Sequence, residues 1–133
     1  MRLRYAPWMP ENHKIYLMKS IVIKRVYEEA QEQDGYRLLV DRLWPRGVSK
    51  EKAQINEWNK ELAPSTELRK WFDHIPERFE EFAKRYEQEL SQHQSELSRI
   101  AQLASTQKLC LLYGAKDEQH NQAVVLKKIL ENC

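Results

Sequence analysis

The chain has 133 residues, a length that predicts one domain with its own hydrophobic core, because domains usually hold roughly 100 to 200 residues. Its composition, 41% hydrophobic and 32% charged, excludes disordered and collagen-like proteins. No apolar run approaches the roughly 18 residues of a membrane span, so no membrane association is expected. The net charge of +2 is carried by residues 1–17. The rest of the chain is therefore neutral, which argues against extended contact with nucleic acid.

The cysteines and histidines follow no disulfide or metal-binding pattern. Cys110 lies within an apolar run and Cys133 is far from it in the sequence, so neither a disulfide framework nor a Cys-x-x-Cys spacing is present. The four histidines share no i, i+4 spacing and stand at positions 13, 74, 93 and 120. We therefore predict a cytoplasmic protein that holds no metal and no cofactor.

The first 17 residues differ from the rest of the chain. Pro7, Trp8 and Pro10 occur there without the continuous apolar stretch of a signal peptide. Met18 immediately precedes the first strand-like segment, and our hypothesis is that Met18 is the natural start. The predicted organisation is an N-terminal extension over 1–17, outside the natural domain, and a single α/β domain over 18–133.

The first half of the chain contains short apolar runs separated by turn residues. Residues 21–27 are rich in β-branched side chains and predict a first strand. The run 38–40 follows the turn dipeptide Asp34-Gly35 and predicts a second strand, which ends before a loop containing Pro45 and Gly47. A short extended piece is also expected over 55–58.

From residue 65 onward the hydrophobic period is that of helices. Apolar residues recur at i, i+3, i+4 and i+7 from Leu68 to Ile75, with Arg69 on the opposite, charged side. Further helices are predicted over 76–90, around 97–104 and around 126–133, the last with Asp117 as a candidate cap. The continuous apolar run 109–113 predicts a strand covered on both faces, which is typical of parallel sheets.

Strands that alternate with helices predict an α/β fold rather than a helical bundle. We expect a small three-layer arrangement, with a mainly parallel sheet of about four strands and helices on both faces. In open sheets of this kind, ligands bind beyond the carboxyl ends of the strands. The residues that follow the predicted strands are therefore the candidates for a functional site.

Charged residues follow the second and the last predicted strand. Arg42, Arg46 and Lys116 would form a clamp for an anion, because guanidinium groups match phosphate or carboxylate in two simultaneous hydrogen bonds. Asp41 and Asp117 would act as acid–base catalysts or hydrogen-bonding groups. In the alternative interpretation Asp41 is the counter-ion of its basic neighbours, and the group only fixes a loop.

For two further residues, a functional role and a structural role are both possible. His74 is a candidate general acid or base, and the alternative is a helix-end histidine that satisfies a carbonyl. Trp44 is a candidate for stacking on a ligand ring, and the alternative is core packing. With three glycines in the chain, neither a dinucleotide-binding motif nor a P-loop motif is present.

Several motifs resemble one known family. They are Val40-Asp41-Arg42-Leu43-Trp44-Pro45-Arg46-Gly47, Trp58-Asn59-Lys60, Ala63-Pro64-Ser65, Leu68-Arg69, Trp71-Phe72, Tyr113 and Ala115-Lys116-Asp117. On these motifs the sequence, from about residue 21 to 130, is similar to the YeaO-like family of uncharacterised bacterial domains, domain of unknown function 488. The resemblance implies a small bacterial cytosolic domain and supplies no mechanism.

Three hypotheses about function follow. The first is an anion-binding cleft for a phosphorylated or carboxylated small molecule, in an enzyme that processes small molecules or nucleotides. The alternative is a non-catalytic binding module for a protein or nucleic-acid partner. The third is a structural protein whose charged strand ends form internal ion pairs. The helices of residues 79–104 either pair between the two subunits of a homodimer through their faces or pack only within one chain, and both alternatives stay open.

Overall fold

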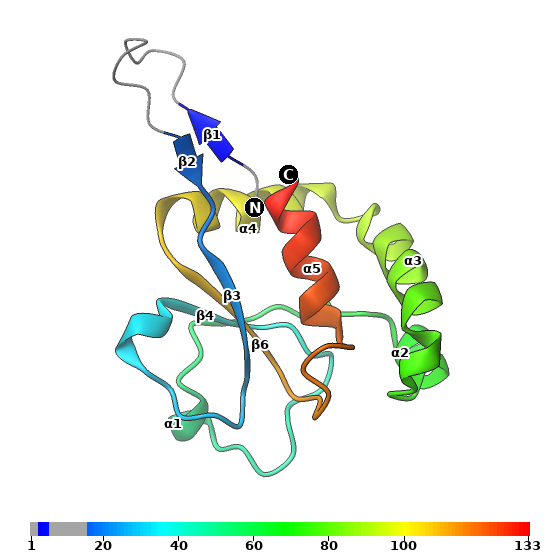
Figure 1. The fold of residues 1–133 in the computed structure, drawn as a ribbon. Helices are drawn as coiled ribbons and strands as arrows, with labels where there is room; N and C mark the ends of the chain where they lie inside the picture. Colours follow the sequence, from blue (N-terminus) through cyan, green and yellow to red (C-terminus); the bar gives the residue numbers. More distant parts are fainter. Residues whose placement is uncertain (1–2, 6–15) are drawn as a thin grey trace.

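The computed structural model describes residues 3–5 and 16–133 of the chain (Figure 1). The elements follow one another in this order: β1 (Leu3–Tyr5), β2 (Tyr16–Met18), β3 (Ile21–Arg25), the 3-10 turn η2 (Glu32–Asp34), β4 (Tyr36–Leu39), α1 (Lys50–Ala53), β5 (Glu57–Trp58), α2 (Thr66–Phe72), the 3-10 turn η3 (Pro76–Arg78), α3 (Phe79–Leu90), α4 (Gln94–Thr106), β6 (Leu109–Tyr113) and α5 (Gln122–Glu131). The predicted extension over 1–17 lies largely outside the described residues. Of this part of the chain, β1 and β2 pair antiparallel in a separate two-stranded sheet.

The main sheet has four strands, all parallel, in the order β3-β6-β4-β5. The last strand in sequence, β6, lies between β3 and β4, so that Leu109 pairs with Ile21 on one side and with Tyr36 on the other. Every residue of β6 is buried, as the continuous apolar run 109–113 predicts. The α/β fold with a mainly parallel sheet of about four strands is confirmed.

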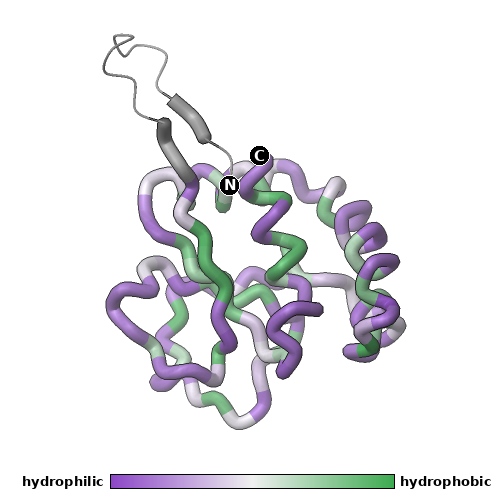
Figure 2. The backbone as a smooth tube through the Cα atoms, viewed as in Figure 1, coloured by the Kyte–Doolittle hydropathy of each residue, from purple (hydrophilic) through white to green (hydrophobic). Residues whose placement is uncertain are grey.

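Both faces of the sheet are covered, but unequally. Side chains alternate between the faces along a strand: Leu38 and Leu111 pack with α2–α5 in the larger core, whereas Leu39 and Leu112 pack in a smaller cluster with Ala53 of α1. Figure 1 shows α2, α3 and α5 on the side of the sheet away from α1. Figure 2 shows hydrophobic residues along β3 and on α5. Helices thus lie on both faces, with one short helix and loops forming the second layer.

Polar side chains cap the amino ends of α1, α2 and α5, whereas α3 and α4 have no side-chain cap. Ser65 accepts the N–H of Leu68 at the start of α2, and Asn121 accepts the N–H of Val124 at 3.2 Å at the start of α5. The prediction that Asp117 caps the last helix is wrong. Its carboxylate instead caps the preceding turn, where Oδ1 accepts the N–H groups of Gln119 and His120.

No helix of the described residues is long and apolar enough to cross a membrane. A cytoplasmic location stays a prediction.

Candidate functional site

A cleft of about 820 Å³ opens at the carboxyl edge of the main sheet. Its lining includes Tyr27, which follows β3, residues 41–46, which follow β4, and residues 114–117, which follow β6. Residues of α2, α3 and the amino end of α5 complete it. Because β3, β4 and β6 are parallel, their carboxyl ends meet at one edge. The cleft lies where the topology of the sheet predicts a ligand site.

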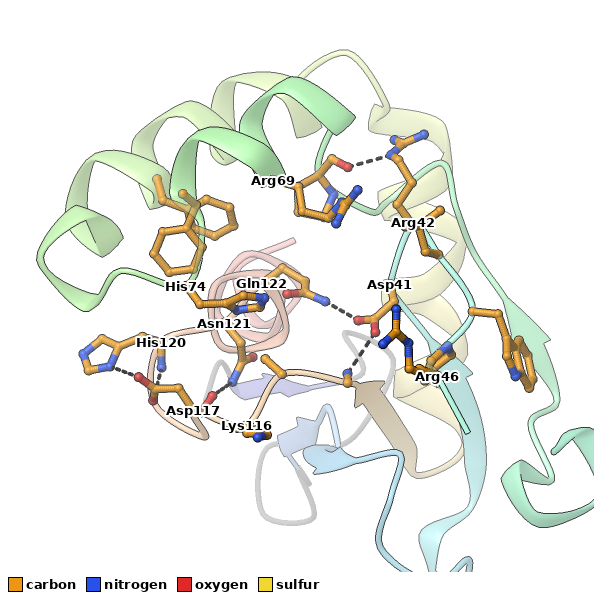
Figure 3. A pocket seen from close by; sticks show the side chains of 18 of the residues that line it. Asp41, Arg42, Arg46, Arg69, His74, Lys116, Asp117, His120, Asn121 and Gln122 are labelled. Carbon is orange, nitrogen blue, oxygen red and sulfur yellow. Dashed lines mark hydrogen bonds and ion pairs between the residues drawn. The ribbon is translucent and has the colours of Figure 1, made fainter. Parts of the chain in front are cut away.

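The seven residues predicted from the sequence as site residues all line this cleft. They are Asp41, Arg42, Trp44, Arg46, His74, Lys116 and Asp117. Figure 3 labels all of them except Trp44. Segments up to 76 positions apart in the chain, from Asp41 to Asp117, are thereby brought together. What each residue does in binding or catalysis stays a prediction, and the contacts below show how each is held.

Asp41 is partly buried, and hydrogen bonds from three other parts of the chain fix its position. The indole Nε1 of Trp58 donates to the backbone carbonyl of Asp41 at 2.7 Å. The carboxylate accepts the backbone N–H of Gly114 at 2.9 Å through Oδ2 and the side-chain amide of Gln122 at 2.5 Å through Oδ1. Both donors are neutral, so the alternative in which Asp41 serves as counter-ion of adjacent basic residues is not the arrangement in this structure.

The environment of Asp41 changes its acidity. Burial raises the pKa of Asp41 to about 6, although the hydrogen bonds from Gly114 and Gln122 and the positive charge of Arg69 act in the opposite direction. Removal of a carboxylate from water disfavours its charged form, and here this effect outweighs the stabilising contacts. The carboxyl group of Asp41 therefore gains and loses its proton near pH 6, whereas the ordinary pKa of an aspartate is 3.8.

Gly114 lets the β6 loop approach Asp41 closely. A Cβ atom built on Gly114 would lie 2.7 Å from Oδ2 of Asp41, nearer than carbon and oxygen atoms can approach without a shift. The hydrogen bond between the two residues depends on this absence of a side chain. The distance explains why glycine fits at this point of the β6 exit.

Arg69, on α2, faces the cleft without a partner in the described part of the protein. The atom Nε is shielded from solvent and has no hydrogen-bond partner, and no ion pair joins the guanidinium to Asp41, although the two residues line the same cleft and interact electrostatically. The sequence pattern assigns Arg69 to the solvent-facing side of its helix, and this is wrong: the side chain is half-buried. The hydrophobic period of a helix shows which side faces the core, but it does not show that the opposite side lines a cleft.

Arg42 has a structural task in addition to any role with a ligand. Its Nε donates to the carbonyl of Pro64 at 2.7 Å, and Nη2 donates to the carbonyl of Ala63 at 3.3 Å. A guanidinium offers five donors, so these bonds fasten the loop that precedes α2 and still leave donors unused. Arg42 holds one wall of the cleft in place.

Arg46 and Lys116 are exposed at the rim. Neither side chain has a hydrogen bond or an ion pair with another described residue. The backbone carbonyl of Arg46, in contrast, accepts the hydroxyl of Tyr27 at 2.9 Å. These two side chains are the cations of the cleft that are most accessible from solvent.

Trp44 and His74 differ in how firmly they are held. The indole of Trp44 donates to the carbonyl of Val48 at 2.6 Å and lies edge-on to Trp58, with ring centroids 5.4 Å apart. This is the packing role that the sequence leaves open as an alternative. His74 is exposed just after α2, in a left-handed backbone conformation, with its ring centroid 6.3 Å from that of Phe72.

Asp117 forms a pair with His120, a residue that the sequence analysis did not single out. Oδ2 of Asp117 lies 2.8 Å from Nδ1 of His120. The pKa of Asp117 is lowered, first by the backbone N–H of Gln119 and then by the hydrogen bond with His120. Since Nδ1 is occupied, Nε2 is the ring nitrogen that remains for a ligand.

The structure thus adds Arg69, His120 and Gln122 to the predicted site. For His120 and Gln122 the sequence holds one usable signal: Asn121 is a good helix cap, and a helix that begins there directs the residues around 120–122 toward the strand ends. The helical spacing of Arg69 gives no such signal. Among the described residues, no group of three or more histidine, cysteine or acidic side chains is arranged to hold a metal ion.

These observations define a small parallel α/β domain with a mixed-charge cleft at the carboxyl edge of its sheet. The sequence model of the family described as "Inactive DUF488-N3 subclade" matches residues 20–133. The chain belongs to this YeaO-like DUF488 family, as its motifs indicate.

Two relatives illustrate the match. The chain is 50% identical over 107 residues to "Uncharacterized protein YeaO" of Escherichia coli, which covers 80% of this chain and 93% of the relative. It is 52% identical over 61 residues to an uncharacterized protein of Mycobacterium tuberculosis, a match over 46% of this chain and 52% of that relative. No solved structure matches the chain.

Proposed function

We propose that this domain binds a small anion, a phosphate or a carboxylate, in the cleft at the carboxyl edge of its sheet. The observation that carries the proposal is the guanidinium of Arg69, which faces the cleft with a solvent-shielded Nε and no protein partner among the described residues. A hydrogen-bond donor held out of water is unfavourable unless an acceptor satisfies it. Phosphate or carboxylate would do so through two parallel hydrogen bonds.

The rest of the cleft supports the same ligand class. Arg46 and Lys116 add two accessible positive charges at the rim. The amide of Gln122 holds the carboxylate of Asp41 at 2.5 Å, which leaves the Arg69 guanidinium for the ligand. An anion that enters the cleft would therefore meet cations from the β4 loop, the β6 loop and α2.

Binding without turnover is the form of this function that we favour. The family to which the chain belongs is described as an inactive subclade. The functional groups that the described lining offers are guanidinium, ammonium, carboxylate, amide and imidazole groups and the phenol of Tyr27. Such groups bind ligands and exchange protons, and they suit a domain that senses or carries an anion.

Titration calorimetry with inorganic phosphate, pyrophosphate and citrate tests this proposal. The wild-type protein is expected to bind at least one of these anions, and Arg69→Met, which keeps the length of the side chain and removes its charge, is expected to lose at least tenfold in affinity. Lys70→Met is the matched control, because Lys70 is the exposed neighbour of Arg69 on α2. Equal affinity of Arg69→Met and wild type, or no binding by wild type, would contradict the proposal.

A second candidate function is acid–base catalysis on the bound anion, and the Asp117–His120 pair is the observation that favours it. A carboxylate on Nδ1 orients the ring and supports a proton on it, the arrangement that general bases commonly use. Together with Asp41 it would give the cleft a base and an acid. Turnover of a phosphate ester by wild type, lost in His120→Gln while anion binding persists, would select this candidate over simple binding.

A further inference from the structure

Tyr27 is an exposed aromatic residue at the rim of the cleft. Its exposed fraction is 46%, and with Leu43 at 58% it is one of the two exposed large hydrophobic residues in the described part of the chain. Both of them line the cleft. Apolar surface left in water at the mouth of a binding site indicates that the ligand itself has an apolar part.

The ring of Tyr27 is held in place before any ligand arrives. Its hydroxyl donates to the backbone carbonyl of Arg46 at 2.9 Å. The guanidinium of Arg25 lies 4.9 Å from the ring centroid and is itself anchored through Nε to the carbonyl of Ala115 at 2.8 Å. A flat ring that is fixed at its hydroxyl and has a cation over one face offers its other face for stacking, and little conformational freedom is lost on binding.

The charge of the lining indicates how many negative charges the ligand carries. The lining contains four cationic side chains, Arg42, Arg46, Arg69 and Lys116, and two carboxylates, Asp41 and Asp117. With the histidines neutral, the net charge of the lining is therefore +2. A phosphate monoester carries about −1.5 to −2 at neutral pH and matches this charge. A zwitterion or a monocarboxylate leaves part of it uncompensated.

The size and floor of the cleft leave room for a ligand much larger than a bare ion. Its volume of about 820 Å³ lies within the range of sites for small organic ligands. Phe72 and Phe82, stacked with centroids 4.4 Å apart, and Pro64 contribute apolar lining. The ligand therefore combines one phosphate group with a substantial organic part.

We propose that the ligand is a phosphate monoester with an aromatic ring, of the nucleoside monophosphate type, and that its ring stacks on Tyr27 while its phosphate meets the cationic side chains. This inference rests on the proposed anion binding. It adds the ligand class and a specificity residue. Arg46 links the two halves, because its carbonyl fixes the ring of Tyr27 while its guanidinium lies at the rim.

The test compares ligands with and without the ring. Titration calorimetry with the four nucleoside 5′-monophosphates, ribose 5-phosphate and inorganic phosphate is carried out on wild type, Tyr27→Phe and Tyr27→Leu. For wild type, at least one nucleotide is expected to bind about tenfold more tightly than ribose 5-phosphate, as stacking of one base on one aromatic ring provides. Tyr27→Leu is expected to reduce this preference below twofold without a change in the affinity for ribose 5-phosphate. Tyr27→Phe, which keeps the ring, is expected to retain most of it.

Leu43→Ala is the comparison variant, because it removes exposed apolar surface from the same rim without removing a ring, and it is expected to keep the preference for nucleotides over ribose 5-phosphate. Tyr27 is exposed, and circular dichroism checks that its variants stay folded. Equal binding of ribose 5-phosphate and nucleotides by wild type overturns the ring inference and leaves the anion site standing, as does an unchanged preference in Tyr27→Leu. Absence of binding by every phosphate tested overturns the nucleotide inference, and the proposed anion site falls with it if citrate does not bind either.

Discussion

Asp41 and Arg69 line the same cleft and influence each other electrostatically, yet they form no ion pair. The carboxylate is bound instead by the backbone N–H of Gly114 and the amide of Gln122. An ion pair between the two would use up both charges. Their separation keeps a cation and a titratable acid available to whatever enters the cleft.

The first prediction concerns Asp41 and the dependence of stability on pH. Its pKa is about 6 in the folded protein, against 3.8 ordinarily, so the folded state holds this proton more tightly than the unfolded state. The contribution of Asp41 to stability is therefore greatest below pH 4 and is lost as the pH rises to 6. Asp41→Asn is expected to be more stable than wild type above pH 6, by at most about 3 kcal/mol, and to show a much smaller difference at pH 4.

Urea denaturation at several pH values measures this difference. Comparing the two proteins at each pH isolates Asp41 from groups such as Asp34, whose pKa is lowered and whose effect has the opposite sign. A difference between Asp41→Asn and wild type that does not change between pH 4 and pH 7 would refute the raised pKa.

The second prediction separates the two arginines of the β4 loop. Arg42 donates to the carbonyls of Pro64 and Ala63, whereas the side chain of Arg46 is exposed at the rim. Arg42→Ala is expected to lower the free energy of unfolding by about 1 to 2 kcal/mol, because carbonyls of the loop lose their donor. Arg46→Ala should stay within about 0.5 kcal/mol of wild type.

Chemical denaturation of both variants measures these changes. Each variant removes one arginine from the same loop, so the general effect of lost charge is matched. Equal stability of the two variants would show that the bonds of Arg42 to the loop before α2 contribute nothing measurable.

The third prediction concerns the turn between β6 and α5. Asp117 accepts the N–H groups of Gln119 and His120 and holds the ring of His120. Asp117→Ala is expected to speed amide hydrogen exchange at positions 119 and 120 while β6 keeps its protection. Asp73→Ala, at an exposed site that does not line the cleft, is the control. Unchanged exchange in the turn would show that backbone contacts alone maintain it.

The fourth prediction concerns the cysteines. Cys110 is fully buried at the centre of the sheet, and burial raises the pKa of its thiol to about 11. Thiolates are the reactive form, so native Cys110 is expected to resist iodoacetamide at pH 8. Cys133, which is partly exposed, provides the internal comparison. Mass spectrometry after alkylation reads both sites, and rapid modification of Cys110 without unfolding would contradict its placement.

Much of this fold follows from local patterns. The predicted strands 21–27 and 109–113 contain β3 and β6, and the run 38–40 overlaps the last two residues of β4. The run 109–113 gives the clearest signal, because a strand buried on both faces needs consecutive apolar residues. The convergence of residues 41–46 and 114–117 at one edge follows from parallel strands alone. That geometric rule placed six of the seven predicted site residues in one cleft without knowledge of any side-chain contact, and His74, which follows α2, is the one that it does not cover.

What the sequence did not reveal depends on neighbours that are distant in the chain. Arg69 has the spacing of a solvent-facing helix residue, and only the packing of α2 over the strand ends turns it into the cleft. Arg42 reaches carbonyls about 20 positions away, a direction that no local pattern encodes. His120 joins the site because the side chain of Asp117 folds the turn back on itself.

The close approach of Gly114 to Asp41 makes the two positions interdependent, although 73 positions separate them. A methyl group at position 114 would occupy the space that Oδ2 of Asp41 now fills. The effect of changing one of the pair would depend on what stands at the other, so a protein engineer who wished to remodel this cleft would have to redesign both strand exits as one unit.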